Sequence, residues 1–599
     1  MSEPALGAWV VSPGQARFRV WAPGVRSLGV ALEGRAPVPL TRVDTGYWST
    51  HAPAEPGDRY RYVFPDGVAR PDPVSMSQPE GVHGPSAVVA PGFAWTDAGF
   101  RPAAVTDWVV YELHVGTFTD RRTFAGVIPH LRRLAELGIT TLQLMPVAEF
   151  AGARNWGYDG VFPWAAHHAY GGLDGLRALV DACHGHGLAV ALDVVYNHLG
   201  PEGNVLGHFG PYFTDRYRTP WGSAVNFDGP GSDAVREYFV ENARFWAREA
   251  HIDALRLDAV HAIFDATAYT FLEELSERLR DDEEEIGRRV VLIAESADND
   301  SLLTAPSGRG GRGYDAQWSD DFHHALHVSL TGERSGYYGD FDGVESLATA
   351  FEHGFVYRGQ HSSFRGRRHG RHHPEVALDR LIAYGQNHDQ VGNRPMGERL
   401  VELVGFEGAK VSLACTLLAP SIPMLFMGEE HGARAPFPYF VSHTDPELVE
   451  AVRRGRAAEF PGFPGVPPDP HAETTFFGAT IDPAARGSEG DGARKLCRDL
   501  LEFRRSHARL RPGGLPVHAR ADAQCQTLLV TWGPDAGEMV LVICFATEDR
   551  EPDLPEGTWV LRLDTASTRY GGPGGSDEPS SPLAPSSARL LERVPDPAR

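Results

Sequence analysis

The chain has 599 residues, of which 42% are hydrophobic and 23% are charged, which is the composition of an ordinary soluble globular protein. One hydrophobic core does not usually extend over this length, so we expect about two to four domains. Acidic residues outnumber basic ones by 79 to 56, and the net charge of −23 argues against nucleic acid or an anionic membrane as a general partner.

The cysteines and the apolar segments predict a reducing, cytoplasmic location. No Cys-x-x-Cys pair occurs among the five cysteines, which are Cys183, Cys415, Cys497, Cys525 and Cys544. We therefore expect neither a disulfide framework nor a zinc site. The first residues, MSEPALGAWV, lack the basic and apolar segments of a secretion signal, and no window reaches about 18 consecutive apolar residues.

Residues 1–100 predict a small β-sandwich. Short alternating runs such as ARFRVWAP (16–23) and GDRYRYVFPDG (57–67) are separated by turn residues. The aromatic residues of this region have two interpretations, a platform on which sugar rings stack or the core of the sandwich, and they include Trp21, Trp48 and Tyr62. For any one of them the core is the more common location.

Residues 101–512 predict a (β/α)8 barrel, because apolar strands alternate here with segments of helical periodicity. Eight strand segments occur, at 107–115, 139–147, 188–198, 252–260, 289–296, 314–326, 380–389 and 422–430. Helical segments fall at 128–138, 173–187 and 235–250, and the last helix of the ring is expected at 493–506. This alternation is typical of a TIM barrel.

Two long excursions interrupt the barrel pattern. Residues 199–232 follow the third strand and predict a polar loop or small subdomain, bearing aromatic residues, at the catalytic face. Residues 356–374 include HSSFRGRRHGRHHP, a basic and histidine-rich run in an acidic protein. This run is interpreted as a solvated mobile loop, the more common case, or as a lid over a sugar site. A loop rich in glycine and arginine offers no preorganised metal-ligand geometry.

The chain returns to β character after residue 513. The runs CQTLLVTW (525–532), EMVLVICFA (538–546) and GTWVLRLD (557–564) are strand-like, and a final strand is expected at 588–594. Together they predict a C-terminal β-sandwich over residues 513–599.

The strand at 252–260 carries two charged residues on one face. With a period of two, Ala254, Arg256 and Asp258 point to one side, whereas Leu255 and Leu257 point to the other. An arginine and an aspartate facing inward are costly to bury without a function. This pattern indicates chemistry rather than packing.

Three acidic residues stand at the carboxyl ends of predicted strands, where barrel enzymes place catalysis. They are Asp258 in ALRLDAV, Glu295 in VLIAES and Asp389 in YGQNHDQ. A single acid at such a position is usually the N-cap of the next helix. Three of them, each beside another polar residue, favour an active site.

Two carboxyls that face one bond are the usual arrangement for glycoside cleavage. Arg256 precedes Asp258 on the same face and would keep that carboxylate ionised. Glu295 follows the apolar run VVLIA, where loss of hydration would raise its pKa toward the working range of an acid. The sequence therefore predicts Asp258 as nucleophile and Glu295 as acid and base.

Four segments resemble the signature regions of the α-amylase superfamily, in order and spacing. They are DVVYNH (193–198), ALRLDAV (254–260), the strand that ends in Glu295, and NHD (387–389). The resemblance covers the whole barrel and fills every polar position of the signatures.

This resemblance implies roles for the three acids. In the family, the residue that matches Asp258 forms the glycosyl-enzyme bond, and the residue that matches Glu295 donates the proton and later acts as base. Asp389 matches an aspartate that binds sugar hydroxyls and strengthens its hold in the transition state.

The resemblance also places sugar-binding residues around the cleaved bond. They are Tyr158 in NWGYDG, His198, Arg256 and His388. Asp193 matches a structural acid held near the arginine.

Two loop residues have open interpretations. Trp221 either stacks on a glucose ring or anchors its loop, with equal weight. His261, one turn beyond Asp258, either reaches a sugar hydroxyl, which is favoured, or caps the next helix.

Two segments narrow the resemblance. FRVWAP (18–23) is similar to the N-terminal module of branching enzymes, glycogen debranching enzymes and maltooligosyltrehalose trehalohydrolases, and residues 219–265 are most similar to the trehalohydrolases. The resemblance implies hydrolysis, with retention, of the α-1,4-glucosidic bond next to the terminal trehalose of maltooligosyltrehalose. Related α-glucans are expected as further ligands, and a maltooligosyltrehalose synthase is expected as pathway partner.

Two alternatives remain at this point. A branching or debranching enzyme would use the same three carboxylates, and a glucan-binding protein without catalysis would lack one of them, although none is missing. No organic cofactor is implied, because glycosyl transfer to water needs none. Asn197 matches a calcium ligand of family α-amylases, but the short insertion at 199–232 lacks an acidic cluster, so no metal is expected.

Overall fold

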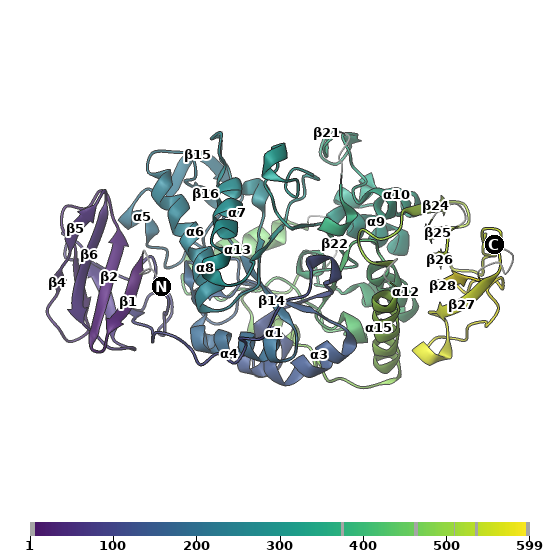
Figure 1. Ribbon diagram of the computed structural model, residues 1–599, viewed down its shortest axis with the longest axis horizontal. Helices are drawn as coiled ribbons and strands as arrows, with labels where there is room; N and C mark the ends of the chain where they lie inside the picture. The colour runs from purple at the N-terminus through teal and green to yellow at the C-terminus, as the bar shows by residue number, and fades with distance from the viewer. Residues whose placement is uncertain (1–5, 373–375, 461–464, 508–509, 534–536, 595–599) are drawn as a thin grey trace.

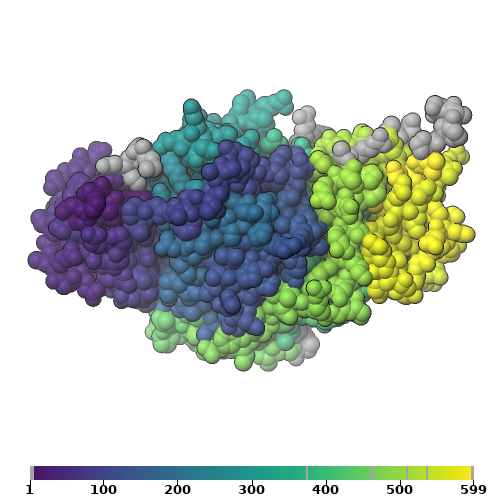
Figure 2. Space-filling model, turned by 60° about the horizontal axis from the view of Figure 1, so that its bottom comes forward, coloured from purple at the N-terminus to yellow at the C-terminus, as the bar shows by residue number. Residues whose placement is uncertain are grey.

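The computed structural model describes residues 6–372, 376–460, 465–507, 510–533 and 537–594, which form an elongated molecule (Figure 1). The N-terminal strands lie at one end, the barrel in the middle and the C-terminal sheet at the other end. The space-filling view in Figure 2 has the same order. No helix in the described ranges is long and apolar enough to cross a bilayer.

The N-terminal strands form two antiparallel sheets with the orders β1-β2-β6-β5 and β4-β3-β7-β8, and β9 pairs with β7. Their bounds are β1 (Gly7–Ser12), β2 (Gln15–Trp21), β3 (Gly29–Leu32), β4 (Val38–Pro39), β5 (Thr41–Asp44), β6 (Tyr47–Pro53), β7 (Arg59–Val63), β8 (Ala69–Arg70) and β9 (Ser86–Ala87). Phe18 of the first sheet meets Tyr60 of the second edge to face, with ring centroids 5.0 Å apart. The two sheets therefore pack as a sandwich.

The aromatic residues considered as a sugar platform are buried. Trp21, Trp48 and Tyr62 expose only 4%, 7% and 0% of their surface. The Trp48 indole N–H donates to the carbonyl oxygen of Ala22 at 3.0 Å, and the Trp21 ring lies 5.3 Å from the ring of Tyr212 in the first insertion. The core interpretation holds, and a stacking platform on these rings is excluded.

Eight parallel strands close into a barrel in the order β10-β11-β14-β17-β18-β19-β22-β23, which confirms the predicted TIM barrel. Their bounds are β10 (Val110–Leu113), β11 (Thr141–Leu144), β14 (Ala189–Val194), β17 (Ala254–Leu257), β18 (Val291–Ala294), β19 (Ala316–Trp318), β22 (Leu381–Tyr384) and β23 (Ile422–Phe426). Ala254 and Ile293 belong to the apolar cluster inside the barrel, whereas Leu255 and Leu257 pack in the larger core with the helices. The period of two thus sets what faces the interior.

Helices surround the barrel, and α3, α4, α6 and α15 coincide with the four predicted helical segments. The longer helices are α3 (Leu131–Leu137), α4 (Gly172–Gly185), α6 (Ser232–Glu249), α7 (Phe271–Asp281), α9 (Asp320–Thr331), α10 (Val344–His353), α12 (Leu400–Leu417), α13 (Pro446–Ala458) and α15 (Ser488–Ser506). The shorter ones are α1 (Val115–Phe118), α2 (Phe124–Val127), α5 (Leu206–Phe209), α8 (Glu283–Ile286), α11 (His388–Gly392) and α14 (Glu473–Gly478). A small antiparallel pair, β12 (Ala148–Glu149) and β13 (Phe162–Ala166), lies between β11 and α4.

The first insertion, residues 199–232, connects the barrel with the N-terminal sandwich. It contains α5 and a hairpin of two strands, β15 (Phe213–Thr219) and β16 (Gly222–Val225). Phe209 meets Phe64 of the sandwich edge to face at 4.9 Å between ring centroids and Tyr62 at 6.0 Å. The insertion is therefore held by apolar contacts rather than being a free loop.

The second excursion forms a short hairpin, made of β20 (His361–Ser362) and β21 (Arg367–Arg368). Asp340 accepts hydrogen bonds from the backbone N–H groups of Ser363 and Phe364 at 2.9 and 3.1 Å, which fixes the turn. Positions 373 and 374 lie outside the described residues. The lid interpretation of this run stays a prediction.

The described C-terminal strands form one five-stranded antiparallel sheet, where the sequence predicted a sandwich. The order is β24-β25-β26-β28-β27, with bounds β24 (Val517–Asp522), β25 (Thr527–Trp532), β26 (Met539–Cys544), β27 (Trp559–Asp564) and β28 (Ser587–Arg593). Leu528 and Val530 face the main core, whereas Leu529 between them packs with Leu554 and Leu583 from loops. The barrel side and these loops bury the two faces, so a second sheet is not needed.

A buried charge network ties the segment before the barrel to the amino-terminal side of the barrel. Asp97 Oδ2 accepts hydrogen bonds from Nδ1 of His184 and Nδ1 of His251, both at 2.7 Å. Nε2 of His184 donates to Asp253 Oδ2 at 2.9 Å. Burial opposes the charge on Asp97, but the hydrogen bonds from His251 and His184 outweigh it and lower the pKa of Asp97 to about 2.

We expect Asp97→Asn to lower the free energy of unfolding by about 3 kcal/mol at neutral pH, because it breaks a buried ion network. Since the folded-state pKa lies below the unfolded value, this stabilisation is complete above about pH 4 and is lost as the pH falls through about 2. Urea unfolding at pH 7 and pH 3 measures it, and the difference from the native chain should shrink at pH 3. An equal difference at both values would contradict the role of the network.

Candidate active site

The three predicted acids lie at the carboxyl end of the barrel. Asp258 directly follows β17, Glu295 directly follows the neighbouring strand β18, and Asp389 lies in α11 after β22. Their side chains expose 12%, 14% and 42% of their surface. All three are therefore reachable from solvent at one end of the barrel.

A buried guanidinium joins two of these acids to a third carboxylate. Nη1 of Arg256 lies 2.9 and 2.8 Å from the two carboxylate oxygens of Asp193 and 2.8 Å from Oδ1 of Asp258. Nη2 lies 3.7 Å from Oε2 of Glu295, and the guanidinium carbon lies 4.2 Å from the centre of the Trp318 ring. The structure thus brings Arg256 together with Asp193, Asp258 and Glu295.

The second oxygen of Asp258 is held by an amide. Asn197 Nδ2 donates at 2.8 Å both to Oδ2 and to the backbone oxygen of Asp258. The carbonyl end of the same amide, Oδ1, pairs with Nδ1 of His198. Both oxygens of Asp258 therefore accept hydrogen bonds, which fixes the orientation of the carboxylate and stabilises negative charge on it.

Glu295 occupies a different environment. Its Oε2 accepts a hydrogen bond from the backbone N–H of Ala259 at 2.6 Å. Ala259 adopts a left-handed conformation with φ 39° and ψ 54°, which is uncommon for a residue with a side chain. Burial raises the pKa of Glu295 to about 8, although Arg256 opposes the shift. Glu295 therefore holds a proton at neutral pH.

A hydrogen-bonded chain crosses the barrel from β10 to β14. Nδ1 of His388 donates to Oε1 of Glu112 at 2.7 Å, and Nε2 donates to the hydroxyl of Tyr158 at 2.7 Å. That hydroxyl donates in turn to Oδ2 of Asp193 at 2.8 Å. Burial opposes a charge on His388, but the Glu112 carboxylate raises its pKa to about 9, so both ring nitrogens are donors at neutral pH.

Asp389 is accompanied by another acid, Asp320, at the start of α9. Asn393 Nδ2 donates to Asp389 Oδ1 at 3.4 Å. The Tyr384 hydroxyl donates to Asp320 Oδ1 at 2.6 Å, and Nε2 of Gln390 approaches the same oxygen at 3.4 Å. Burial raises the pKa of Asp320, and the charge of Asp389 adds to the shift.

The two loop residues with open interpretations lie on the rim. The Trp221 ring stacks on His198, with centroids 4.7 Å apart, and is 50% exposed. One face of the indole is thus covered by His198, and half of its surface stays open. His261 lies exposed in the 3₁₀ turn η4 (Val260–Ala262). Thr270 caps the next helix, so His261 does not.

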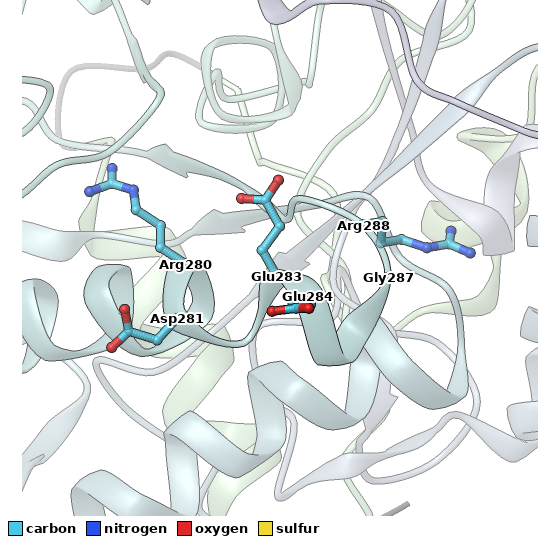
Figure 3. A pocket seen from close by; sticks show the side chains of 6 residues that line it. All are labelled: Arg280, Asp281, Glu283, Glu284, Gly287 and Arg288. Atoms are coloured by element: carbon cyan, nitrogen blue, oxygen red, sulfur yellow. The ribbon is translucent and has the colours of Figure 1, made fainter.

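One surface hollow of the described residues lies away from the three acids. Figure 3 shows this hollow of about 560 Å³ between α7 and α8, and its lining residues are Arg280, Asp281, Glu283, Glu284, Gly287 and Arg288. This segment precedes β18, so the hollow lies toward the amino ends of the strands, opposite the acids.

One group of three possible metal ligands comes together among the described residues: Glu149, His167 and His168. Nε2 of His167 donates to the carbonyl oxygen of Gly152 at 3.2 Å, and its Nδ1 accepts from the backbone N–H of Ala169 at 3.1 Å. Both nitrogens of His167 are therefore engaged by the backbone. This group lies in the β12–β13 region rather than among the three predicted acids.

Comparison with known proteins assigns a family to this geometry. The family profile described as "Alpha amylase, catalytic domain" matches residues 106–210. Malto-oligosyltrehalose trehalohydrolases from Saccharolobus solfataricus and Arthrobacter ramosus are 43% and 45% identical to the chain, over 82% and 84% of its length and 84% and 88% of theirs. The one from Rhizobium sp. is 41% identical over 94% of this chain and 97% of its own. The chain belongs to the malto-oligosyltrehalose trehalohydrolase family.

Solved structures show the same overall fold. A putative α-amylase from Salmonella typhimurium, 36% identical, has a TM-score of 0.88 over 98% of this chain and 100% of its own. A pullulanase from Anoxybacillus sp., 18% identical, has a TM-score of 0.69 and shares the fold. The predicted resemblance to the α-amylase superfamily is confirmed, and the chain is a glycosidase of that type.

The trehalohydrolase-family site contains residues that the sequence analysis did not single out. Glu112 occupies an inward position of an apolar strand. The same pattern predicted a function for Arg256, so Glu112 could also have been predicted from the sequence. Asp320 stands two residues after the end of β19 and was equally visible as an acid near a strand end. The left-handed backbone at Ala259 could not be predicted, because alanine is not a residue type that signals this conformation. Asn197 was considered only as a metal ligand.

We expect Glu112→Gln to remove the charge on His388 at neutral pH. Because burial opposes the imidazolium, loss of the carboxylate should lower the pKa of His388 from about 9 toward or below its ordinary value of 6.5. An NMR titration of the folded chain with labelled histidine measures this pKa. Glu136→Gln, which alters an exposed acid on α3, is the matched control and should leave it near 9. A His388 pKa near 9 in both variants would show that a group other than Glu112 stabilises the imidazolium.

Proposed function

We propose that this chain hydrolyses the α-1,4-glucosidic bond next to the terminal trehalose of malto-oligosyltrehalose, releasing trehalose and a shortened maltooligosaccharide. The observation that carries the chemistry is a pair of unlike carboxyls beside one guanidinium. Asp258 accepts hydrogen bonds from Arg256 and Asn197, whereas burial raises the pKa of Glu295 to about 8. A carboxylate and a carboxylic acid on neighbouring strands are what a retaining glycosidase needs. The names of the relatives support the trehalose-bearing substrate.

In the first step, Asp258 attacks the anomeric carbon at the cleaved bond, and Glu295 gives its proton to the glycosidic oxygen. The bond between carbon and oxygen breaks, and trehalose leaves with a complete hydroxyl group. Because Oε2 of Glu295 accepts from Ala259, the proton is carried on Oε1. Arg256 keeps the attacking carboxylate in place through its 2.8 Å hydrogen bond.

In the second step, the ionised Glu295 takes a proton from a water molecule, and the resulting hydroxide attacks the glycosyl ester on Asp258. The ester bond breaks, Asp258 returns as a carboxylate, and Glu295 is again protonated. One water is consumed for each bond cleaved. Two inversions at the same carbon retain its configuration.

The remaining predicted residues form the surroundings of the sugar. Asp389, with 42% of its side chain exposed, is proposed to bind sugar hydroxyls, and the cationic His388 beside it to act on the sugar subsite through its charge and through the Tyr158 hydroxyl that it holds. The open part of Trp221 suits the apolar face of a glucose ring. His261 is proposed as a further hydroxyl contact from the rim. Tyr158 and His198 complete this set on the β14 side.

The substrate itself places this reaction after another one. A trehalose unit at the end of an α-1,4-glucan arises when an enzyme rearranges the reducing-end linkage. We propose that a malto-oligosyltrehalose synthase supplies the substrate and that related α-glucans also bind.

The substrate assignment predicts that the purified chain releases free trehalose from malto-oligosyltrehalose. Asp258→Asn should lower kcat by about 10⁴-fold or more, because the amide is no nucleophile. Chromatographic quantification of trehalose and of the remaining oligosaccharide measures both. A change in the iodine staining of amylose without trehalose release would indicate a branching enzyme instead. Binding of the glucan without any product would indicate a scaffold.

The acid role of Glu295 predicts the alkaline limit of activity. The acid must be protonated, so kcat/KM should fall as the pH rises through about 8, where Glu295 loses its proton. Glu295→Gln should lose about 10²- to 10⁴-fold in kcat and also lose this limb of the profile. The pH dependence of initial rates measures it. A fall centred near 4.5, or full activity in Glu295→Gln, would reject this role.

A further inference from the structure

A cationic cavity lies on the outer wall of the barrel, away from the catalytic acids. It has a volume of about 390 Å³ and lies between α3 and α15, which neighbour each other in Figure 1. Its cationic lining residues are Arg133, Arg486, Arg494, Lys495 and Arg498. Three carboxylates also line it, so the five cations leave an excess of two positive charges in a protein whose net charge is −23.

The carboxylates around the cavity already have other partners. Glu136 accepts from the Nε of Arg132 at 2.8 Å, outside the cavity. Glu430 accepts from the Tyr111 hydroxyl at 3.0 Å and pairs with His431 at 2.9 Å. The hydrogen bonds of these two acids therefore go to groups that do not line the cavity, and Glu430 also lies 4.0 Å from Arg133.

The third acid, Asp491, pairs with two of the cations, and two further cations have no acidic partner among the described residues. Asp491 lies 3.4 Å from Arg486 and 3.3 Å from Arg494. Lys495 and Arg498 form no ion pair with any carboxylate in the described part of the chain, and both are exposed at the cavity. The positive charge of this wall is therefore incompletely balanced.

Two buried donors in the cavity wall are unsatisfied. Nη2 of Arg133 and Nε of Arg494 form no hydrogen bond within the described residues, and the nearest ion-pair contact of Arg133 is Glu430 at 4.0 Å. The Arg494 side chain is only 13% exposed. Burial lowers the pKa of Arg494, the charge of Glu430 opposes this shift, and the neighbouring charge of Arg133 adds to it. An unpaired buried donor is unfavourable, and a hydrogen bond to an anion would offset this cost.

We propose that this cavity binds the phosphate group of a small anion, with Arg133 and Arg494 in the wall and Lys495 and Arg498 at the mouth. A phosphate monoester carries a charge of about −1.5 to −2 at neutral pH, which matches the local excess. Its oxygens accept several hydrogen bonds at once, as a group of guanidinium donors requires. Leu134 and Leu137 provide an apolar wall for the remainder of such a molecule.

The cavity is connected to the barrel through Glu430. The Tyr111 hydroxyl, on β10, donates to Glu430 and accepts from the backbone N–H of Gly428 at 2.9 Å. An anion bound beside Arg133 is therefore linked through Glu430 and Tyr111 to β10, the strand that also carries Glu112. Because it binds only the folded chain, it should also raise thermal stability.

Calorimetric titration of the full chain with pyrophosphate, and separately with a hexose phosphate, tests the proposal at constant ionic strength. Saturable binding of either probe, with one site per chain, is expected. The double variant Lys495→Glu and Arg498→Glu should weaken it at least tenfold, because both residues are exposed and their replacement reverses the charge at the mouth.

The matched control is Arg454→Glu with Arg520→Glu, which makes the same charge change at two exposed positions remote from the cavity. Binding to this control should equal binding to the native chain. The proposal is overturned if neither probe binds saturably, if the Lys495 and Arg498 variant binds as tightly as the native chain, or if both double variants weaken binding equally. Since a hexose phosphate also carries a sugar, only binding that the cavity variant weakens counts in its favour.

Discussion

The guanidinium of Arg256 is the interaction on which the catalytic end of the barrel depends. Removing an arginine from water costs several kcal/mol unless anions surround it, and Asp193 and Asp258 supply them from two strands. One nitrogen contacts both carboxylates, so the buried Asp193 helps to fix the position of Asp258, the nucleophile that we propose. The Trp318 ring packs against the guanidinium in a cation–π contact.

The same arrangement gives chemically similar side chains different protonation states. Asp258 accepts hydrogen bonds from a guanidinium and an amide, whereas Glu295, 3.7 Å from the same guanidinium, accepts one from a backbone N–H. His388 shows the converse case, since a buried carboxylate keeps it charged where burial alone would discharge it. Each protonation state follows from the neighbours that a strand end supplies, and strands from all around the barrel contribute them.

Much of this was predictable from the sequence because strand periodicity has local causes. The alternation around Arg256 predicted a polar inward face, and acids after apolar runs predicted Asp258 and Glu295. The single C-terminal sheet was not predictable in this way, because Leu528 and Leu529 are both apolar and alternation says nothing about what covers each face. Backbone strain at Ala259 and convergence of cations between α3 and α15 likewise depend on segments far apart in the chain.

The first insertion gives the N-terminal sandwich a part in the architecture of the active site. One end of it presses Phe209 and Tyr212 against the sandwich, and the other carries Trp221 to the edge of the catalytic rim. Removal of the residues before β10 would expose the rings of Phe209 and Tyr212 to solvent. The hairpin that carries Trp221 would then lose its packing support. The N-terminal sandwich therefore supports the insertion that carries Trp221 to the rim of the barrel.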